Sequence, residues 1–95
     1  MTITIQIGNS DDKLTQKEWS LFVSAVRREI AAMPHTDVHF FGCASAYSQW
    51  QNACWVVETW SNVATRNLKK GIQAIRQEFR QDSVAWTQGK TLFIV

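Results

Sequence analysis

Proline, glycine and cysteine are all scarce in this chain of 95 residues, which contains one, four and two of them respectively. Four dispersed glycines leave no glycine-rich loop that could cradle a phosphate. Two cysteines are too few for a disulfide-dense mini-protein. Charged residues make up 19% of the chain, below the usual ~25%, but the apolar share of 45% excludes a disordered tail.

Long hydrophobic runs are also missing. The run at the C-terminus covers only residues 92–95, whereas a helix needs ~20 apolar residues to cross a bilayer. No membrane partner is therefore expected. The length allows one domain, which we place at residues 1–95.

Neither sign of charge dominates, because 10 basic and 8 acidic residues give a net charge of +2. Dedicated nucleic-acid-binding domains are strongly basic, so nucleic acid is not an expected partner. Residues 1–5 lack the charged start and apolar run of a secretion signal. We therefore expect a cytoplasmic protein, of a bacterium or of an infected host cell, with free thiols.

Periodicity predicts the order strand, helix, strand, strand, helix, strand. Residues 2–7 alternate strictly between isoleucine and polar side chains, which is typical of a half-buried strand. Thr15 and Glu18 fit a capping box that opens the first helix, and Pro34 ends it. Ser61 or Asn62 is expected to cap the second helix. The remaining strands are predicted at residues 38–44, 53–60 and 83–95, the last with a bulge or tight turn at residues 88–90.

This order is the α+β, ferredoxin-like βαββαβ pattern, a four-stranded antiparallel sheet with two helices on one face. Right-handed crossovers predict the strand order 4-1-3-2. The alternative is a meander in which the last segment forms a separate hairpin around Gln88 and Gly89.

Aromatic residues are plentiful, with five Trp, five Phe and one Tyr. Trp19 is expected in the core, and Trp60 is interpreted as structural. Trp50, Trp55 and Trp86 are expected in a loop and on the sheet face that no helix covers. An exposed apolar patch of this kind marks an interface or a ligand site, so we expect a homo-oligomer and a ligand-binding surface.

The loop between the second and third strands carries the most suggestive residues, Tyr47, Trp50, Gln51 and Asn52. Flat rings interleaved with amides suit a planar ligand that needs stacking and edge hydrogen bonds, such as a nucleobase. The alternative is a long hairpin loop tucked under its own tryptophan.

A second cluster, at the end of the second helix, contains Arg76, Arg80, Asp82 and Ser83. Arg80, or Lys13 from the first loop, could bind the anionic part of a ligand. The alternative is arginine placed favourably at a helix C-terminus. The loop after the first strand and the turn before the last are expected at opposite ends of the sheet. These residues therefore need not form one site within a single chain, and a dimer could bring them together.

Catalytic and cofactor signals are weak. His39, Cys43 and Cys54 could approach one another in one strand register, but they lack the spacing of a metal site, and neither metal nor cofactor is expected. Glu58 is the one carboxylate that could be buried near aromatic rings and act as a base. No serine lies in a nucleophile elbow, so an enzyme is not the leading hypothesis.

Three blocks, residues 8–14, 50–55 and 80–86, resemble a family of small proteins of actinobacteria and their phages that have no assigned activity. The resemblance implies a phage-type accessory protein, a class whose members often inhibit host enzymes or sequester host signalling molecules. It implies no catalytic residue.

The leading hypothesis is a non-enzymatic, oligomeric binding protein for a nucleotide-like molecule, such as a host defence signal. Its expected site residues are Lys13, Tyr47, Trp50, Gln51, Asn52, Trp55, Arg80, Asp82, Ser83 and Trp86. The alternatives are a protein–protein inhibitor of a host enzyme and an enzyme of the dimeric α/β-barrel type. The enzyme would enclose an apolar pocket between two sheets, with Glu58 or His39 as acid or base.

Overall fold

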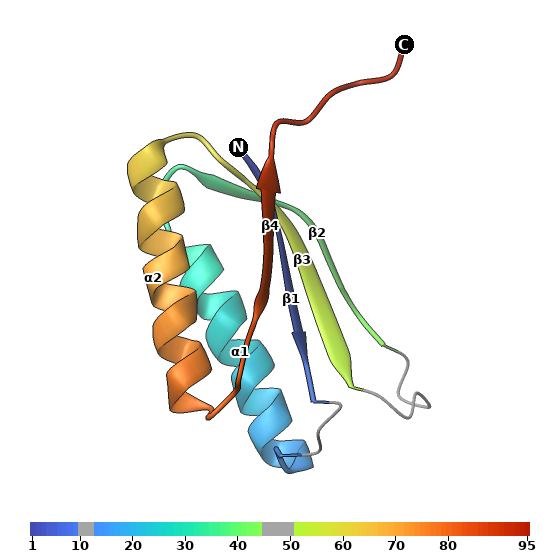
Figure 1. Ribbon diagram of the computed structural model, residues 1–95, viewed down its shortest axis with the longest axis vertical. Coiled ribbons are helices and arrows are strands. Elements are labelled where there is room, and N and C mark those ends of the chain that lie inside the picture. Colours follow the sequence, from blue (N-terminus) through green and yellow to red (C-terminus); the bar gives the residue numbers. More distant parts are fainter. Residues whose placement is uncertain (10–12, 45–50) are drawn as a thin grey trace.

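A computed structural model describes residues 1–9, 13–44 and 51–95. Its element order confirms the predicted ferredoxin-like pattern (Figure 1). The elements are β1 (Thr2–Gly8), α1 (Gln16–Ala32), β2 (Thr36–Cys43), β3 (Asn52–Thr59), α2 (Asn62–Glu78) and β4 (Ala85–Gly89).

The sheet has the strand order β2-β3-β1-β4, with every pairing antiparallel. This confirms the predicted order. Both helices lie on one face (Figure 1), and we call the other face the open face. No helix among the described residues is long and apolar enough to cross a membrane.

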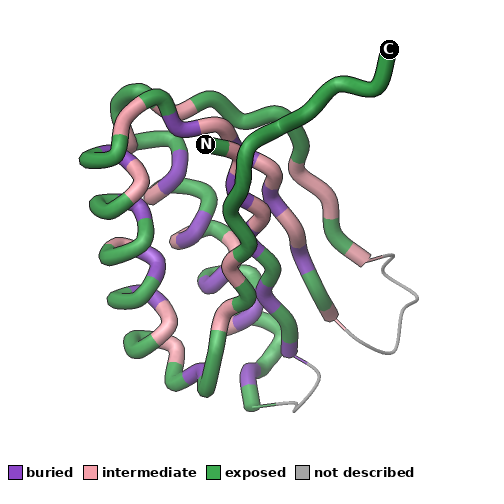
Figure 2. Tube along the Cα trace, turned by 45° about the horizontal axis from the view of Figure 1, so that its top comes forward, coloured by how far each residue is buried: buried purple, intermediate pink, exposed green. Residues whose placement is uncertain are grey.

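Strand register decides which residues face the helices. Ile5 of β1 pairs with Trp55 of β3 and with Trp86 of β4, so all three side chains share the helix face. Buried residues lie on the two central strands, β1 and β3, and on the inward sides of the helices (Figure 2). The core combines this face with the apolar stripes of the helices: Ile3, Ile5, Ile7, Ala53, Trp55, Val57, Trp19, Phe22, Val26, Ile30, Leu68, Ile72 and Ile75.

Local sequence signals place the helices. The Thr15 hydroxyl accepts the backbone N–H of Glu18, and the Glu18 carboxylate accepts that of Thr15, which completes the predicted capping box. Ser61 is the N-cap of α2 and accepts from the Ala64 N–H. Each cap satisfies backbone donors that the first turn of a helix leaves without partners.

Strand β2 contains a bulge. Val38 pairs with Val57, but Phe40 pairs with Val56, so His39 is an extra residue between them. The predicted alternation would have put Val38 and Phe40 on the same face. The bulge instead moves Phe40 to the open face and leaves Phe41 against Trp55, with ring centroids 5.0 Å apart.

The last predicted strand is too long. β4 ends at Gly89, which pairs with Thr2 at the start of β1, and the separate hairpin around Gln88 and Gly89, which was the alternative, does not form. Residues past Gly89 have no stretch of β1 beside them to supply backbone partners. The composition of residues 91–95 suits a strand, but strand formation requires a neighbour as well as propensity.

Candidate functional site

A groove of about 890 Å³ lies on the open face. It lies where β1 begins and β3 ends, and the chain that follows β4 forms one of its walls. Carbon-rich side chains make up most of the lining, with one carboxylate among them. The lining residues are Met1, Thr2, His39, Val56, Glu58, Trp60, Lys90, Thr91 and Phe93.

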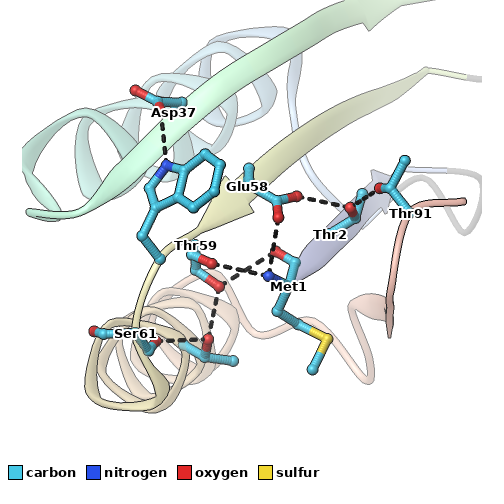
Figure 3. Close-up of polar contacts among 9 residues, drawn as sticks. Met1, Thr2, Asp37, Glu58, Thr59, Ser61 and Thr91 are labelled. Atoms are coloured by element: carbon cyan, nitrogen blue, oxygen red, sulfur yellow. Dashed lines mark hydrogen bonds and ion pairs between the residues drawn. The ribbon is translucent and has the colours of Figure 1, made fainter. Parts of the chain in front are cut away.

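Glu58 anchors a set of polar contacts in this groove. The Thr2 hydroxyl donates to one carboxylate oxygen at 2.7 Å. The Met1 amino group donates to the other oxygen at 3.0 Å and to the Thr59 carbonyl. The hydroxyls of Thr2 and Thr91 also bond to each other, so the contacts continue from β1 into the chain after β4 (Figure 3).

These donors keep Glu58 ionised. The hydrogen bond from Thr2, then that from the Met1 amino group, lower the pKa of Glu58 below its ordinary value of 4.5. The charge of the amino group and that of His39 act in the same direction. A carboxylate can accept about four hydrogen bonds. Glu58 can therefore take a further donor from a ligand.

Trp60 forms one edge of the groove, with 65% of its surface exposed. Its indole N–H donates to Asp37 of β2 at 2.7 Å, which holds the ring in place. Sequence reasoning interpreted Trp60 as structural, but the structure exposes it. Its position directly after a strand and before a helix cap was the available signal, because binding residues are often found at such junctions.

Two expected stacking residues do not face the groove. Trp55 is 1% exposed and lies in the core, and Trp86 is half-buried against that core. The Lys69 amino group lies 5.7 Å from the centre of the Trp86 ring. The expectation that both rings lie on the uncovered face was wrong, because their register with Ile5 turns them towards the helices.

The predicted loop is described only in part, since Tyr47 and Trp50 lie outside the described residues. Gln51 joins two loops: its side-chain oxygen accepts from Asn9 at 2.8 Å, and its amide donates to Gln16 at 2.5 Å. Asn52 begins β3, and its carbonyl accepts the Ala44 N–H at 3.0 Å. The described contacts of Gln51 hold the fold together.

The charged residues of the second cluster come together, but away from the groove. Lys13 pairs with Asp82 at 3.0 Å, and Arg80 pairs with Glu18 at 2.6 Å. These contacts correct the expectation that the loop after β1 and the turn after α2 lie at opposite ends of the sheet. Both lie at the same end (Figure 1), because β1 and β4 are antiparallel neighbours and the end of β1 therefore lies beside the start of β4.

Ser83 lines a separate shallow hollow at that end. The hollow has a volume of about 370 Å³ and is also lined by Gln6, Gly8, Gln81 and Asp82. Arg76 donates to the Gln81 carbonyl at 2.6 Å, so its guanidinium is engaged by backbone. The described residues that the sequence predicted for the site therefore lie in three places. Some lie in or against the core, some lie at this end of the sheet, and some make the loop contacts that hold the fold together.

The two cysteines lie on opposite faces of the sheet. Cys43 pairs with Ala53, and Cys54 pairs with Gly42, so the register is the one that separates the thiols. Both are free. Over residues 1–9, 13–44 and 51–95, no group of three His, Cys, Asp or Glu side chains could hold a metal ion.

The sequence matches no protein-family model and no curated protein. The fold, however, is shared with solved structures. A dimeric ferredoxin-like protein of unknown function from Thermobifida fusca superposes with a TM-score of 0.62 and 13% identity, over 90% of this chain and 86% of that one. A candidate antibiotic biosynthesis monooxygenase from Deinococcus radiodurans superposes with a TM-score of 0.55 and 11% identity. The match covers 100% of this chain and 99% of that one.

A phage SAM lyase in its apo state gives a TM-score of 0.46 with 16% identity, over 90% of this chain and 75% of that one. The likeness to the first two structures, at 13% and 11% identity, is one of fold.

Proposed function

We propose that the protein is a homodimeric, non-catalytic binding protein for a small apolar molecule that carries a positively charged or hydrogen-bond-donating group. The observation that carries this proposal is the groove of about 890 Å³, with mostly apolar walls and the ionised Glu58 at its base. Ligand pockets typically have volumes of roughly 300–1,000 Å³, apolar linings and a few placed polar groups.

Binding suits Glu58 better than proton transfer does. A general base works best when its pKa lies near the working pH. Hydrogen bonds from Thr2 and Met1 shift the pKa of Glu58 the other way. The carboxylate is thus suited to pair with an ammonium or similar donor, which argues against the dimeric barrel enzyme with Glu58 as its base.

The open face supports the dimer. Its side chains on β1, β3 and β4 are short and, apart from Glu58, uncharged: Thr2, Thr4, Gln6, Cys54, Val56, Ala85 and Thr87. The centres of protein interfaces are depleted of charged residues, whereas a solvated sheet face usually carries them. The Thermobifida fusca protein of the same fold is itself dimeric.

Nucleotide-like molecules remain a second class of ligand for the same groove. His39 and Lys90 line it and could approach a phosphate, and Trp60 offers an exposed ring. The case is weaker than the sequence suggested, because Trp55 and Trp86 are turned towards the helices.

Thermal unfolding with a ligand panel tests the proposal. The panel contains arylalkyl amines, the matching neutral alcohols, and linear and cyclic nucleotides. A ligand at 100 times its dissociation constant should stabilise the protein by about 2.7 kcal/mol. We expect the amines to bind more tightly than the alcohols, and Glu58→Gln to abolish that preference.

Glu78→Gln is the matched control, because Glu78 is an exposed carboxylate at the end of α2. This variant should bind the amines as the wild type does. Stabilisation by nucleotides alone would favour the second ligand class. The proposal fails if no member of the panel stabilises the protein, or if Glu58→Gln binds amines and alcohols as the wild type does.

A further inference from the structure

The chain beyond β4 exposes an unusual amount of apolar surface. Leu92, Phe93, Ile94 and Val95 are 80%, 85%, 101% and 118% exposed. We call residues 90–95 the arm. Figure 2 shows it exposed along its whole length, in contrast to the strands beside it. Four consecutive large apolar side chains in water are costly, and the described part of the fold does not cover them.

The arm leaves the molecule on the side of the open face. It continues from the edge strand β4, bends away from the helices and extends beyond the end of the sheet (Figure 1). The hydroxyls of Thr91 and Thr2 hold its first part over β1. Phe93 lines the groove, but Ile94 and Val95 bury nothing. The arm is thus fixed at its base and free beyond it.

The open face offers a matching apolar surface. Phe40 is 55% exposed and pairs with Val56 on this face. Its ring lies over Gly42, since a Cβ at that position would come within 2.7 Å of the Phe40 Cζ atom. A side chain at position 42 would therefore lift the ring off the sheet. Glycine leaves a flat aromatic patch beside the uncharged residues of the neighbouring strands.

We propose that residues 92–95 of each copy pack across the open face of a second copy, on the patch formed by its Phe40 and Val56. This inference rests on the homodimer of the proposed function. The chain carries both halves of the contact, an apolar arm and an apolar face, and within one molecule they leave each other largely uncovered. A two-fold axis pairs both halves at once, as isologous dimers require.

This exchange of arms between two copies, which we call the arm exchange, would also complete the ligand site. The groove in one chain is open on the side away from the sheet, and a second sheet with its own arm would close it. Phe93 would then contribute to a pocket enclosed by both copies. The binding site would exist in full only in the dimer.

Intermolecular cross-linking tests the exchange. Both native cysteines are first removed from the 95-residue protein by Cys43→Ser and Cys54→Ser. One preparation of this protein then carries Phe93→Cys, and a second preparation, which differs from the first in mass, carries Phe40→Cys. Under mild oxidation, we expect the mixture to form a covalent dimer of the two. The matched control replaces Phe40→Cys with Leu21→Cys, which alters a comparably exposed apolar residue on α1. The control mixture should form far less cross-linked product.

The dimer dissociation constant gives a second readout. Because the arm makes no contribution to the core, Phe93→Ser should leave the circular dichroism spectrum unchanged. We expect this variant to raise the dissociation constant about tenfold or more, as the loss of one buried aromatic ring predicts. A chain truncated after Thr91 should be affected more strongly.

Three results would overturn the inference. One is a truncated chain that dimerises as tightly as the full chain. Another is cross-linking no stronger with Phe40→Cys than with Leu21→Cys. The third is a disulfide that forms within a monomer when one chain carries both Phe93→Cys and Phe40→Cys. Such a bond would mean that the arm folds back on its own sheet. Cross-linking without ligand binding would refute the proposed function alone, and ligand binding without cross-linking would refute the arm exchange alone.

Discussion

Glu58 shows how a single residue acquires its character from its neighbours. Its carboxylate accepts hydrogen bonds from the Thr2 hydroxyl at 2.7 Å and from the Met1 amino group at 3.0 Å. Both contacts favour the ionised form and lower the pKa. A group whose pKa is lower in the folded state stabilises the fold above its unfolded pKa, and this stabilisation is lost as the pH falls through the folded value.

The first prediction concerns the pH dependence of that stabilisation. At pH values above 4.5, the ordinary pKa of this carboxyl, the free energy of unfolding should be larger for the wild type than for Glu58→Gln. The difference should shrink as the pH falls below 4.5 and Glu58 is protonated. Urea unfolding of both proteins between about pH 3 and pH 7 measures it. Glu78→Gln serves as the control, and a difference that stays constant with pH would contradict the assignment.

The second prediction separates two tryptophans. Trp55 is 1% exposed and Trp60 is 65% exposed. Trp55→Ala should lower the free energy of unfolding by about 3–5 kcal/mol, because it leaves a large cavity in the core. Trp60→Ala should change it by no more than about 0.5 kcal/mol, but should weaken ligand binding in the groove. Equal losses of stability in chemical denaturation would show that one of the two side chains has been placed wrongly.

The five tryptophans also show what could be predicted at this scale. Helical spacing placed Trp19 in the core, where it lies. Alternation along residues 53–60 groups Trp55 with Val57, opposite Val56 and Glu58, and the structure has this grouping. Alternation could not tell which group faces the helices, because both contain apolar side chains. That choice depends on register with Ile3 and Ile5 of β1, which is a property of the sheet and not of one strand.

Helix α2 packs closely against α1 at Gly71. A Cβ atom at this position would overlap the carboxylate of Glu29 and come within 2.9 Å of its Cγ. Glycine in a helix costs about 1 kcal/mol relative to alanine. The obstacle is the end of a flexible side chain, so Glu29 can move aside at a modest cost.

The third prediction follows from this contact. In a Glu29→Ala background, Gly71→Ala should raise the free energy of unfolding by about 1 kcal/mol. In the wild type the gain should be smaller, because the Glu29 side chain must first move. A double-mutant cycle measured by urea unfolding gives the coupling between the two positions. Destabilisation by Gly71→Ala in both backgrounds would mean that the backbone of α1 sets the limit.

At the level of elements, caps and periodicity predicted both helices, since Thr15, Glu18 and Ser61 act within one turn of the chain. The errors fell on the edge strands. The end of β4 depends on where β1 begins, and the bulge in β2 depends on its pairing with β3. Both are decided by residues distant in sequence. The candidate groove was missed for the same reason, because its lining comes from β1, β2, β3 and the arm.

The whole molecule has two different ends. At one end, ion pairs from Lys13 to Asp82 and from Arg80 to Glu18 tie the loops together. At the other end lie the groove and the arm. The open face joins the two ends and carries little charge. This low charge agrees with the homodimer proposed above, because the centres of protein interfaces are depleted of charged residues.

The fourth prediction is made at this scale. If the native state is a dimer, its unfolding temperature should rise with protein concentration, because association stabilises the folded state by mass action. Calorimetry over a wide range of concentrations measures the shift. Phe93→Ser should reduce the concentration dependence while the protein still unfolds cooperatively. An unfolding temperature independent of concentration in the wild type would contradict the dimer.

The bulge in β2 has a consequence for how this chain can change over generations. His39 lies between Val38 and Phe40 in β2 and has no pairing partner on β3. Removing its codon would leave those two neighbours paired as they are, with Phe41 still against Trp55. The imidazole that lines the groove can thus be gained or lost in one genetic step, while the core on one side and the aromatic patch on the other are inherited intact.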